Sequence, residues 1–172
     1  MIGSTPPSRL IATPRGEVRL RAEREGDGDF LRRLFAANRA GLFGPDVPAA
    51  MAESLIAMQH RAQTLSYRQN FPDARFWIAE LGSEPIGRYI EHDENEAIDI
   101  IDIALLPEFQ QRGIGSALVR STQQLASSSK RCVRAMVLSD NDASLKMFRR
   151  LEFTATDKDE VHLHLVWPAS RP

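Results

Sequence analysis

Gln110-Gln111-Arg112-Gly113-Ile114-Gly115-Ser116-Ala117 joins a predicted apolar strand to a predicted amphipathic helix. Its two glycines let the backbone turn tightly and approach a ligand without a Cβ in the way. The helix that begins here presents unpaired backbone N–H groups and the positive end of its dipole. Arg112 adds a forked donor suited to phosphate. We therefore expect this loop to hold a phosphate or a pyrophosphate.

Two well-known nucleotide-binding motifs do not fit the loop. A dinucleotide-binding fingerprint needs a third small residue where Leu118 stands. A Walker A loop needs a Gly-Lys-Ser/Thr ending, and this stretch holds no lysine. A binder of nucleotide phosphates that uses neither motif stays open as an alternative.

The hydrophobic pattern on both sides of the loop predicts a series of strands and helices. Strands are expected at residues 18–21, 76–81, 86–91, 98–106, 133–138 and 161–167, and helices at about 27–39, 51–65, 114–128 and 143–151. This order predicts an α/β (α+β) fold with a mixed, mostly antiparallel sheet flanked by about four helices. Residues 1–16 hold three prolines and are expected to form a flexible tail, so that one domain spans 17–168.

The second predicted helix carries a continuous apolar stripe. Its members are Met51, Leu55, Met58, Ala62 and Leu65. Their spacing places them on one helix face. We interpret this stripe as core packing rather than as a cofactor site.

The composition is typical of a globular domain. The chain has 172 residues, of which 42% are hydrophobic, and a net charge of −1. A single cysteine, Cys132, excludes an internal disulfide and a multi-cysteine zinc site, and no metal is expected. The sequence contains no pattern of a membrane span or a signal peptide, so the cytoplasm is the expected compartment. The balanced charge gives no reason to expect nucleic-acid binding.

Charge is nevertheless distributed unevenly along the chain. Residues 79–109 hold nine acidic residues and one basic residue, whereas residues 110–150 hold eight basic and two acidic residues. The sign changes at the glycine loop, which suggests an anionic ligand on one side and a cationic one on the other. Glu91 and Glu94 are candidates for attracting a cationic acceptor. Solvated helix and loop faces are the alternative explanation for either block.

Two stretches, Pro107–Gly115 and Ser139–Phe153, together resemble the GNAT superfamily of N-acetyltransferases. The first is similar to the family's acyl-CoA motif, Gln/Arg-x-x-Gly-x-Gly/Ala, after an apolar strand. The second is similar to the family's Asn-x-x-Ala-x-x-x-Tyr-x-x-x-Gly-Phe helix. The resemblance spans about Ile98 to Phe153, and the part of the chain before it matches only in the order of its elements.

The resemblance implies acetyl-CoA as the cosubstrate. The pantetheine arm would lie along the end of the strand as an additional strand does, and the pyrophosphate would lie on main-chain N–H groups of the loop. The roles carry over to Ile103, Ala104 and Leu105 for the pantetheine, to Gln110, Gln111, Arg112, Gly113, Ile114, Gly115 and Ser116 for the pyrophosphate, and to Asn141, Ser144 and Phe148 in the second motif.

The reaction that the resemblance implies is direct attack of an amine on the thioester. A primary amine with a pKa near ~10 is mostly protonated at neutral pH, so a carboxylate must take a proton directly or through water. Asp99 is the favoured base, and Asp102 is the other candidate, unless it is a buried acid bonded to main chain or to an arginine. Three residues apart on a regular strand, the two would face opposite sides, so only one would enter a given cleft.

The chain departs from the family pattern at two positions. Phe148 stands where the family places its tyrosine acid, and Glu152 replaces a glycine, which predicts a different helix ending. The leading hypothesis is an acetyl-CoA-dependent N-acetyltransferase acting on a small-molecule or peptide amine, with a homodimer as a common state of similar proteins. The alternative is a CoA-binding protein of the same fold that senses or scaffolds with little turnover.

Other residues with reactive side chains have simpler explanations. The two tyrosines are Tyr67 and Tyr89, and we interpret Tyr89 as a packed side chain. His162 and His164 share one strand face but have no cysteine partner, so a surface pair is expected. Cys132 has no histidine near it in the sequence and is interpreted as a partly buried structural thiol.

Overall fold

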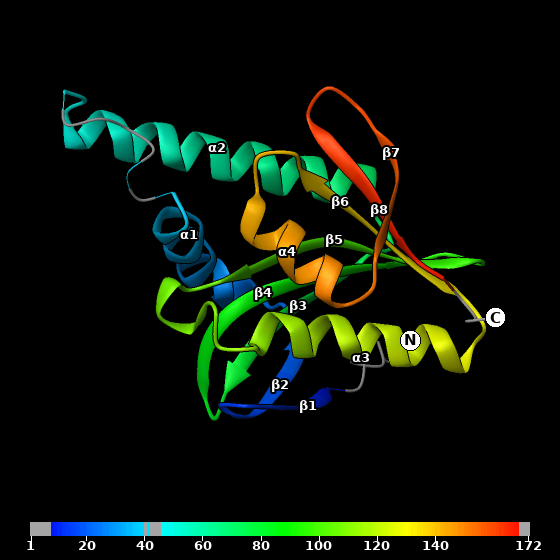
Figure 1. Ribbon diagram of the computed structural model, residues 1–172. Helices are drawn as coiled ribbons and strands as arrows, with labels where there is room; N and C mark the ends of the chain where they lie inside the picture. The colour runs from blue at the N-terminus through cyan, green and yellow to red at the C-terminus, as the bar shows by residue number, and fades with distance from the viewer. Residues whose placement is uncertain (1–7, 40, 42–45, 169–172) are drawn as a thin grey trace.

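A computed structural model describes residues 8–39, 41 and 46–168 of the chain (Figure 1). The strands are β1 (Arg9–Thr13), β2 (Gly16–Ala22), β3 (Arg75–Leu81), β4 (Glu84–Asp93), β5 (Ala97–Leu105), β6 (Cys132–Leu138), β7 (Thr154–Lys158) and β8 (His162–Trp167). The helices are η1 (Glu25–Asp27), α1 (Gly28–Ala37), α2 (Ala49–Asn70), η2 (Pro107–Phe109), α3 (Ile114–Ser128) and α4 (Asp142–Arg150), of which η1 and η2 are short 3-10 turns. Within these ranges, no helix combines the length and the hydropathy needed to span a lipid bilayer.

The strands form one sheet in the order β1-β2-β3-β4-β5-β6-β8-β7. Neighbouring strands are antiparallel except β5 and β6, which run parallel and are joined by α3. A parallel pair needs a crossover connection of this kind, whereas the antiparallel pairs can be joined by short turns. The predicted mixed, mostly antiparallel sheet with four α-helices is confirmed for the described part of the chain.

Helices cover both faces of the sheet (Figure 1). On one face, α3 and α4 pack against the sheet, and Leu118 of α3 is fully buried in a cluster with Trp77 and Tyr89. On the other face, α1 packs through Leu34 against Ile78 of β3. Successive side chains of a strand point to opposite faces, which is why β3 contributes to both clusters.

β5 and β6 separate part of the way along their length. Ala97–Ile100 pairs with Cys132–Ala135, and among the described residues the pairing does not continue beyond Ile100. The remaining halves of the two strands therefore have backbone edges that face a gap rather than each other. This gap lies beside the loop that leads into α3.

Residues 9–16 are not a flexible tail, in contrast to the prediction. β1 pairs with β2 at the edge of the sheet, and Ile11 is buried in the same cluster as the core side of α3. Arg9 Nη1 and Nη2 donate to the two carboxylate oxygens of Glu91 at 3.1 and 2.8 Å. The sheet therefore begins at Arg9 and not after residue 16, while residues 1–7 lie outside the described part of the chain.

The apolar stripe of α2 is not core packing either. Met51, Met58 and Leu65 are exposed by 56%, 60% and 58%, and α2 contains no buried residue. The spacing correctly places these side chains on one face of the helix. The prediction is wrong because spacing does not tell whether that face turns toward the sheet or toward solvent.

Candidate active site

The gap between β5 and β6 belongs to a cleft with a volume of about 1960 Å³. One side of the cleft is formed by β5, β6 and the beginnings of α3 and α4. The other side is formed by α1 and α2, over the opposite face of the sheet. The cleft thus passes between the strands and reaches both faces, which allows two ligands to meet in the middle.

The backbone edge of β5 faces the gap in an alternating manner. Leu106 N donates to Ile86 O of the β4 side at 2.9 Å, so the main-chain groups of Ala104 also face β4. The main-chain groups of Ile103 and Leu105 face the gap instead. Of the three residues predicted for the pantetheine, Ile103 and Leu105 can offer backbone groups to it, and Ala104 can offer only its side chain.

The carbonyl of Leu105 is already occupied by two side chains. Asn38 Nδ2, just after α1, donates to Leu105 O at 3.0 Å, and Gln110 Nε2 donates to the same oxygen at 2.8 Å. Gln110 Nε2 also donates to Asn38 Oδ1 at 2.7 Å. The Gln110 side chain therefore ties α1, β5 and the loop together and does not point to a phosphate, so Ile103 is left as the main backbone partner for an extended ligand.

The loop before α3 has the backbone shape that its glycines predict. Gly113 has a φ of 81°, in the left-handed region, and a Cβ on it would come within 3.0 Å of Pro14 Cγ. Gln111, Gly113, Gly115 and Ser116 line the cleft. Ile114 is fully buried in the core and Arg112 is exposed. Of the residues predicted for the pyrophosphate, the four from Gln111 to Ser116 that line the cleft form a cradle of main-chain groups. Ile114 instead packs in the core, and Arg112 holds its guanidinium in solvent.

The start of α4 forms the opposite wall of the loop region. Asn141 Oδ1 caps the helix by accepting from Ser144 N at 3.1 Å, and both residues line the cleft. A Cβ on Gly115 would lie 3.4 Å from Met147 Sδ, an ordinary contact distance, so α3 and α4 approach closely here. The two predicted motifs are thus brought together at one end of the cleft.

The end of α4 does not differ from the family pattern as the sequence predicted. Glu152 has a φ of 67°, the left-handed conformation that a glycine would take. Glu152 N donates to Arg149 O at 3.0 Å and Phe153 N donates to Phe148 O at 3.1 Å, which together form a Schellman motif. The hydrogen-bonded ending therefore persists with a non-glycine residue. Phe148 itself is 4% exposed and meets the ring of Phe153 edge-on, with 4.9 Å between the centroids.

A β-bulge in β5 overturns the prediction that Asp99 and Asp102 face opposite sides. Asp102 is paired with Ile90 and Ile100 with Glu91, so Ile101 is an extra residue on β5. The extra residue shifts the side-chain alternation by one. Asp99 and Asp102 therefore lie on the same face, the one covered by α1 and α2, and both line the cleft.

Asp102 lies at the centre of a polar cluster under α2. Arg88 Nε donates to Asp102 Oδ2 at 3.0 Å, and the Tyr67 hydroxyl donates to Asp102 Oδ1 at 3.3 Å. Arg88 Nη2 also donates to Gln63 Oε1 at 2.9 Å. Burial, and next the negative charge of Asp102, raise the pKa of Tyr67 well above its ordinary value, so the phenol stays protonated at physiological pH.

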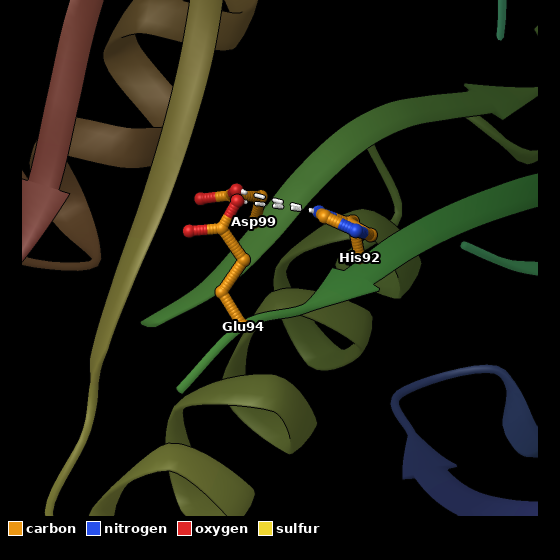
Figure 2. A group of neighbouring side chains, drawn as sticks. All are labelled: His92, Glu94 and Asp99. Carbon is orange, nitrogen blue, oxygen red and sulfur yellow. Dashed lines mark ion pairs between the residues drawn. The ribbon is translucent and has the colours of Figure 1, made fainter. Parts of the chain in front are cut away.

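Asp99 belongs to a second cluster, at the paired end of β5 and β6. Arg134 Nε and Nη2 donate to its two oxygens at 2.5 and 2.7 Å, and Nη2 also donates to Glu94 Oε2 at 2.7 Å. Figure 2 shows His92, Glu94 and Asp99 converging, with His92 Nδ1 3.6 Å from Glu94 Oε1 and 3.8 Å from Asp99 Oδ2. Arg134 thus provides the positive charge for both carboxylates, and the group is an ion-pair cluster at the edge of the cleft.

Glu91 does not face an acceptor. It is 1% exposed on the α3 face, where it accepts from Arg9, from Trp77 Nε1 at 3.0 Å and from the Thr122 hydroxyl. Tyr89, also fully buried, shares a hydrogen bond of 2.7 Å with Thr122, which confirms it as a packed residue. Glu91 therefore serves a buried ion pair and is not open to a cationic acceptor.

His162 and His164 are more than a surface pair. Both line the cleft from β8, and Asp159 lies 3.5 Å from His162 Nδ1 and 3.2 Å from His164 Nε2. They face the same side of the sheet as Met136 and Leu138, their direct partners on β6. Sequence reasoning missed this position because the pairing of β6 with β8 is a long-range contact. Cys132 is intermediate in exposure, as expected.

A family model for the acetyltransferase (GNAT) family matches residues 47–153, well over half of the chain. The chain belongs to the GNAT acetyltransferase family. The match extends 51 residues ahead of Ile98, and so includes α2, β3 and β4, where sequence resemblance alone was limited to the order of elements.

Solved structures share this GNAT fold. A PaiA N-acetyltransferase from Thermoplasma acidophilum, solved in complex with coenzyme A, has a TM-score of 0.66 at 18% identity, covering 88% of this chain and 98% of that one. RimJ from Mycobacterium smegmatis, solved in complex with CoA-disulfide, has a TM-score of 0.65 at 15% identity, covering 94% and 87%. At these identities the likeness establishes the fold.

A curated relative is similar to this chain over a shorter stretch. It is an acetyltransferase of Pectobacterium atrosepticum, ECA0875, 29% identical over 83 residues. The match covers 48% of this chain and 59% of the relative's length. The similarity is therefore limited to part of both proteins.

Proposed function

We propose that the chain is an acetyl-CoA-dependent N-acetyltransferase in which an amine attacks the thioester directly. The observation that carries this proposal is the separation of β5 from β6 beyond Ile100 and Ala135, next to the N-terminus of α3. An extended pantetheine needs an unpaired strand edge, and a pyrophosphate needs a helix start with accessible N–H groups. One cleft holds both features.

Membership of the GNAT family and the CoA bound to two similar folds support acetyl-CoA as the cosubstrate. The cradle of Gln111, Gly113, Gly115 and Ser116 would take the pyrophosphate, and Ile103 would pair with the pantetheine. Lys146 and Arg150 of α4 line the same end of the cleft and would balance phosphate charge. We expect the reaction to take place in the cytoplasm, the default for a chain with a single cysteine.

Asp102 is the better placed of the two candidate bases. It lies beyond the bulge, next to Ile103, where β5 has separated from β6. Asp99 lies where the strands are still paired, and Arg134 donates to both of its oxygens, whereas Asp102 accepts from an arginine on one oxygen only and from the Tyr67 hydroxyl on the other. We assign to Asp102, through a bound water, the removal of a proton from the acceptor amine, and to Asp99 the positioning of Arg134.

The leaving thiolate does not receive its proton from Phe148, which has none to give. Tyr67 lines the cleft, but its raised pKa makes it a poor proton donor to a thiolate. We therefore assign Tyr67 to orienting Asp102 and the protonation of the thiolate to water. The backbone N–H groups of β5 that face the gap would stabilise the oxyanion.

The buried Phe148 favours one alternative, a CoA-binding protein of the same fold with little turnover. One experiment distinguishes the two functions. Pure protein is incubated with acetyl-CoA and a mixed set of primary amines, and free CoA thiol is followed over time. Release far above the rate without amine supports the enzyme, whereas tight CoA binding without release for any amine supports the alternative.

Asp102→Asn tests the assignment of the base. We expect kcat/KM to fall about 100-fold, the usual size of a lost general base, with the largest loss at low pH, where the amine is most protonated. The matched variant Asp99→Asn should retain more activity, because it changes only a residue that holds Arg134. An unchanged pH profile in Asp102→Asn together with a changed one in Asp99→Asn would reverse the two roles.

A further inference from the structure

The half of the sheet formed by β6, β8 and β7 has an uncovered face inside the cleft. On β6, Val133, Ala135 and Val137 are buried on the α3 side, so the residues between them face the other way. Met136 and Leu138 on that side are exposed by 55% and 45%. Two neighbouring apolar side chains on the wall of a cleft are available to pack against an apolar part of a ligand.

The neighbouring strand extends this apolar floor. His164 and His162 on β8 are the direct cross-strand partners of Met136 and Leu138, and Val166 lies next to them as the partner of Arg134. All of these residues line the cleft, together with Thr156 of β7. Asp159 holds the two imidazole rings from the β7–β8 turn. The floor is therefore a continuous surface that starts where β6 separates from β5 and leads away from the reacting centre.

The charges around the floor do not suit a polycation. The carboxylates on this side of the cleft, Asp99 and Asp102, are each bonded to an arginine, Arg134 and Arg88 respectively. Arg39 also lines this side, and its guanidinium stacks on Phe35. Each of the two carboxylates that line this side of the cleft is therefore already bonded to a guanidinium group, which disfavours a polyamine as their partner.

We infer that the acceptor is a primary amine attached to an apolar body, and that Met136 and Leu138 bind that body while the amine reaches Asp102. This inference deepens the proposed function and rests on the same cleft. A linear apolar group on the floor would gain affinity with each carbon that it buries, whereas a polyamine such as spermidine would gain none and would meet Arg88 and Arg134.

A homologous series of alkylamines from butylamine to octylamine tests the inference in two ways. Dissociation constants for CoA-loaded protein are measured by calorimetry, and kcat/KM values are measured by CoA release from acetyl-CoA. We expect both to improve about twofold or more with each added methylene, since a buried methylene is worth up to about fourfold. Spermidine should be the poorer acceptor than octylamine by at least about tenfold.

Met136→Glu places a charge on the floor, and Met58→Glu is its matched control on the outer face of α2, with 60% exposure against 55%. Met136→Glu should abolish the dependence on chain length in both measurements and leave the affinity for CoA unchanged, which also reports that the protein is folded. Met58→Glu should preserve the dependence, and Met136→Leu should restore it.

The two proposals fail in different ways. If alkylamines bind with the expected dependence and no acetyl group is transferred to any amine, the proposed enzyme activity is wrong and the apolar site stands. If transfer occurs but neither affinity nor kcat/KM depends on chain length, or if spermidine is preferred, the apolar acceptor is wrong and the enzyme activity stands. Equal loss in Met136→Glu and Met58→Glu would also overturn the inference.

Discussion

α2 and α3 both carry an apolar stripe, and the two helices use it in opposite ways. In α3, Ile114 and Leu118 are fully buried against the sheet. In α2, the stripe that contains Met58 faces solvent, while the inward side carries Gln63 and Tyr67, which bond to the polar cluster around Asp102. α3 is therefore held by its apolar side, and α2 presents its polar side to the cleft.

This difference separates a structural helix from one that shapes a site. α3 must be fixed if its N-terminus is to hold the proposed pyrophosphate, and Thr122 further ties the helix to Glu91 and Tyr89. α2 contributes polar groups to the proposed acceptor side, and its contacts with the rest of the chain are sparse by comparison. Substitutions on the cleft side of such a helix can therefore alter the contacts with an acceptor without disturbing the hydrophobic core.

The largest expected effect concerns the start of α3. Gly115→Asp should weaken CoA binding at least about a thousandfold, or ~4 kcal/mol, because a carboxylate would stand at the proposed pyrophosphate site. Gly115→Ala is the control, since its Cβ would meet Met147 Sδ at an ordinary 3.4 Å. Calorimetric titration with CoA measures both. An unchanged affinity in Gly115→Asp would refute the assignment of the loop.

A second prediction compares the two stripes directly. Leu118→Ala in α3 should lower the free energy of unfolding by about 3 kcal/mol, because it leaves a cavity in the core. Met58→Ala in α2 should change it by no more than about 0.5 kcal/mol, as is usual for an exposed side chain. Urea denaturation gives both values. A larger loss for Met58→Ala, or one that varies with protein concentration, would mean that the outer face of α2 is covered in solution.

Tyr67→Phe tests the role of the side of α2 that faces the cleft. The variant removes one hydrogen bond to Asp102, worth about 1 kcal/mol, so kcat/KM should fall about fivefold. The pH profile should keep its high-pH limb, because a phenol that only orients Asp102 does not titrate in the reaction. A loss of several hundredfold with a changed alkaline limb would instead identify Tyr67 as the proton donor to the thiolate.

The smallest effect is a pH dependence of the contact between α1 and α2. Burial, and next the charges of Arg88 and Arg32, lower the pKa of His60, whose ring packs on Phe35 with 5.3 Å between the centroids. The folded state therefore favours the neutral ring. The stability that this ring contributes is present above its unfolded pKa of about 6.5 and is lost as the pH falls below that value. Thermal unfolding at about pH 7.5 and about pH 5.5 should show a modest drop that His60→Phe reduces.

Several features of the fold could be predicted from local sequence. The bounds of α3 match the predicted 114–128, because a glycine start, a regular apolar face and a polar end all act within one segment. The loop before it was identified for the same reason, and Gly113 takes the left-handed conformation that its position requires. β1 and β7 were missed, since both are short, and the burial of Ile11 depends on α3, more than 100 residues away.

The candidate site could be predicted only in part. The sequence identified Asp99 and Asp102, but a regular alternation put them on opposite faces, and the bulge at Ile101 arises from the pairing of β5 with β4. It identified Gln110 as a ligand contact, but the side chain instead bonds to Asn38 and Leu105. In each case the deciding contact joins segments that are distant in the chain or depends on strand register.

By itself, the sequence determined the order of most elements, the glycine loop that begins α3 and the family, because propensity, turn geometry and spacing act between near neighbours. The tertiary structure alone decided that β5 and β6 separate, that the stripe of α2 faces outward and that Met136 and Leu138 remain open in the cleft. These outcomes depend on which faces of the sheet and of the helices are covered when all elements pack together. A linear pattern fixes which side chains share a face, and packing fixes what that face meets.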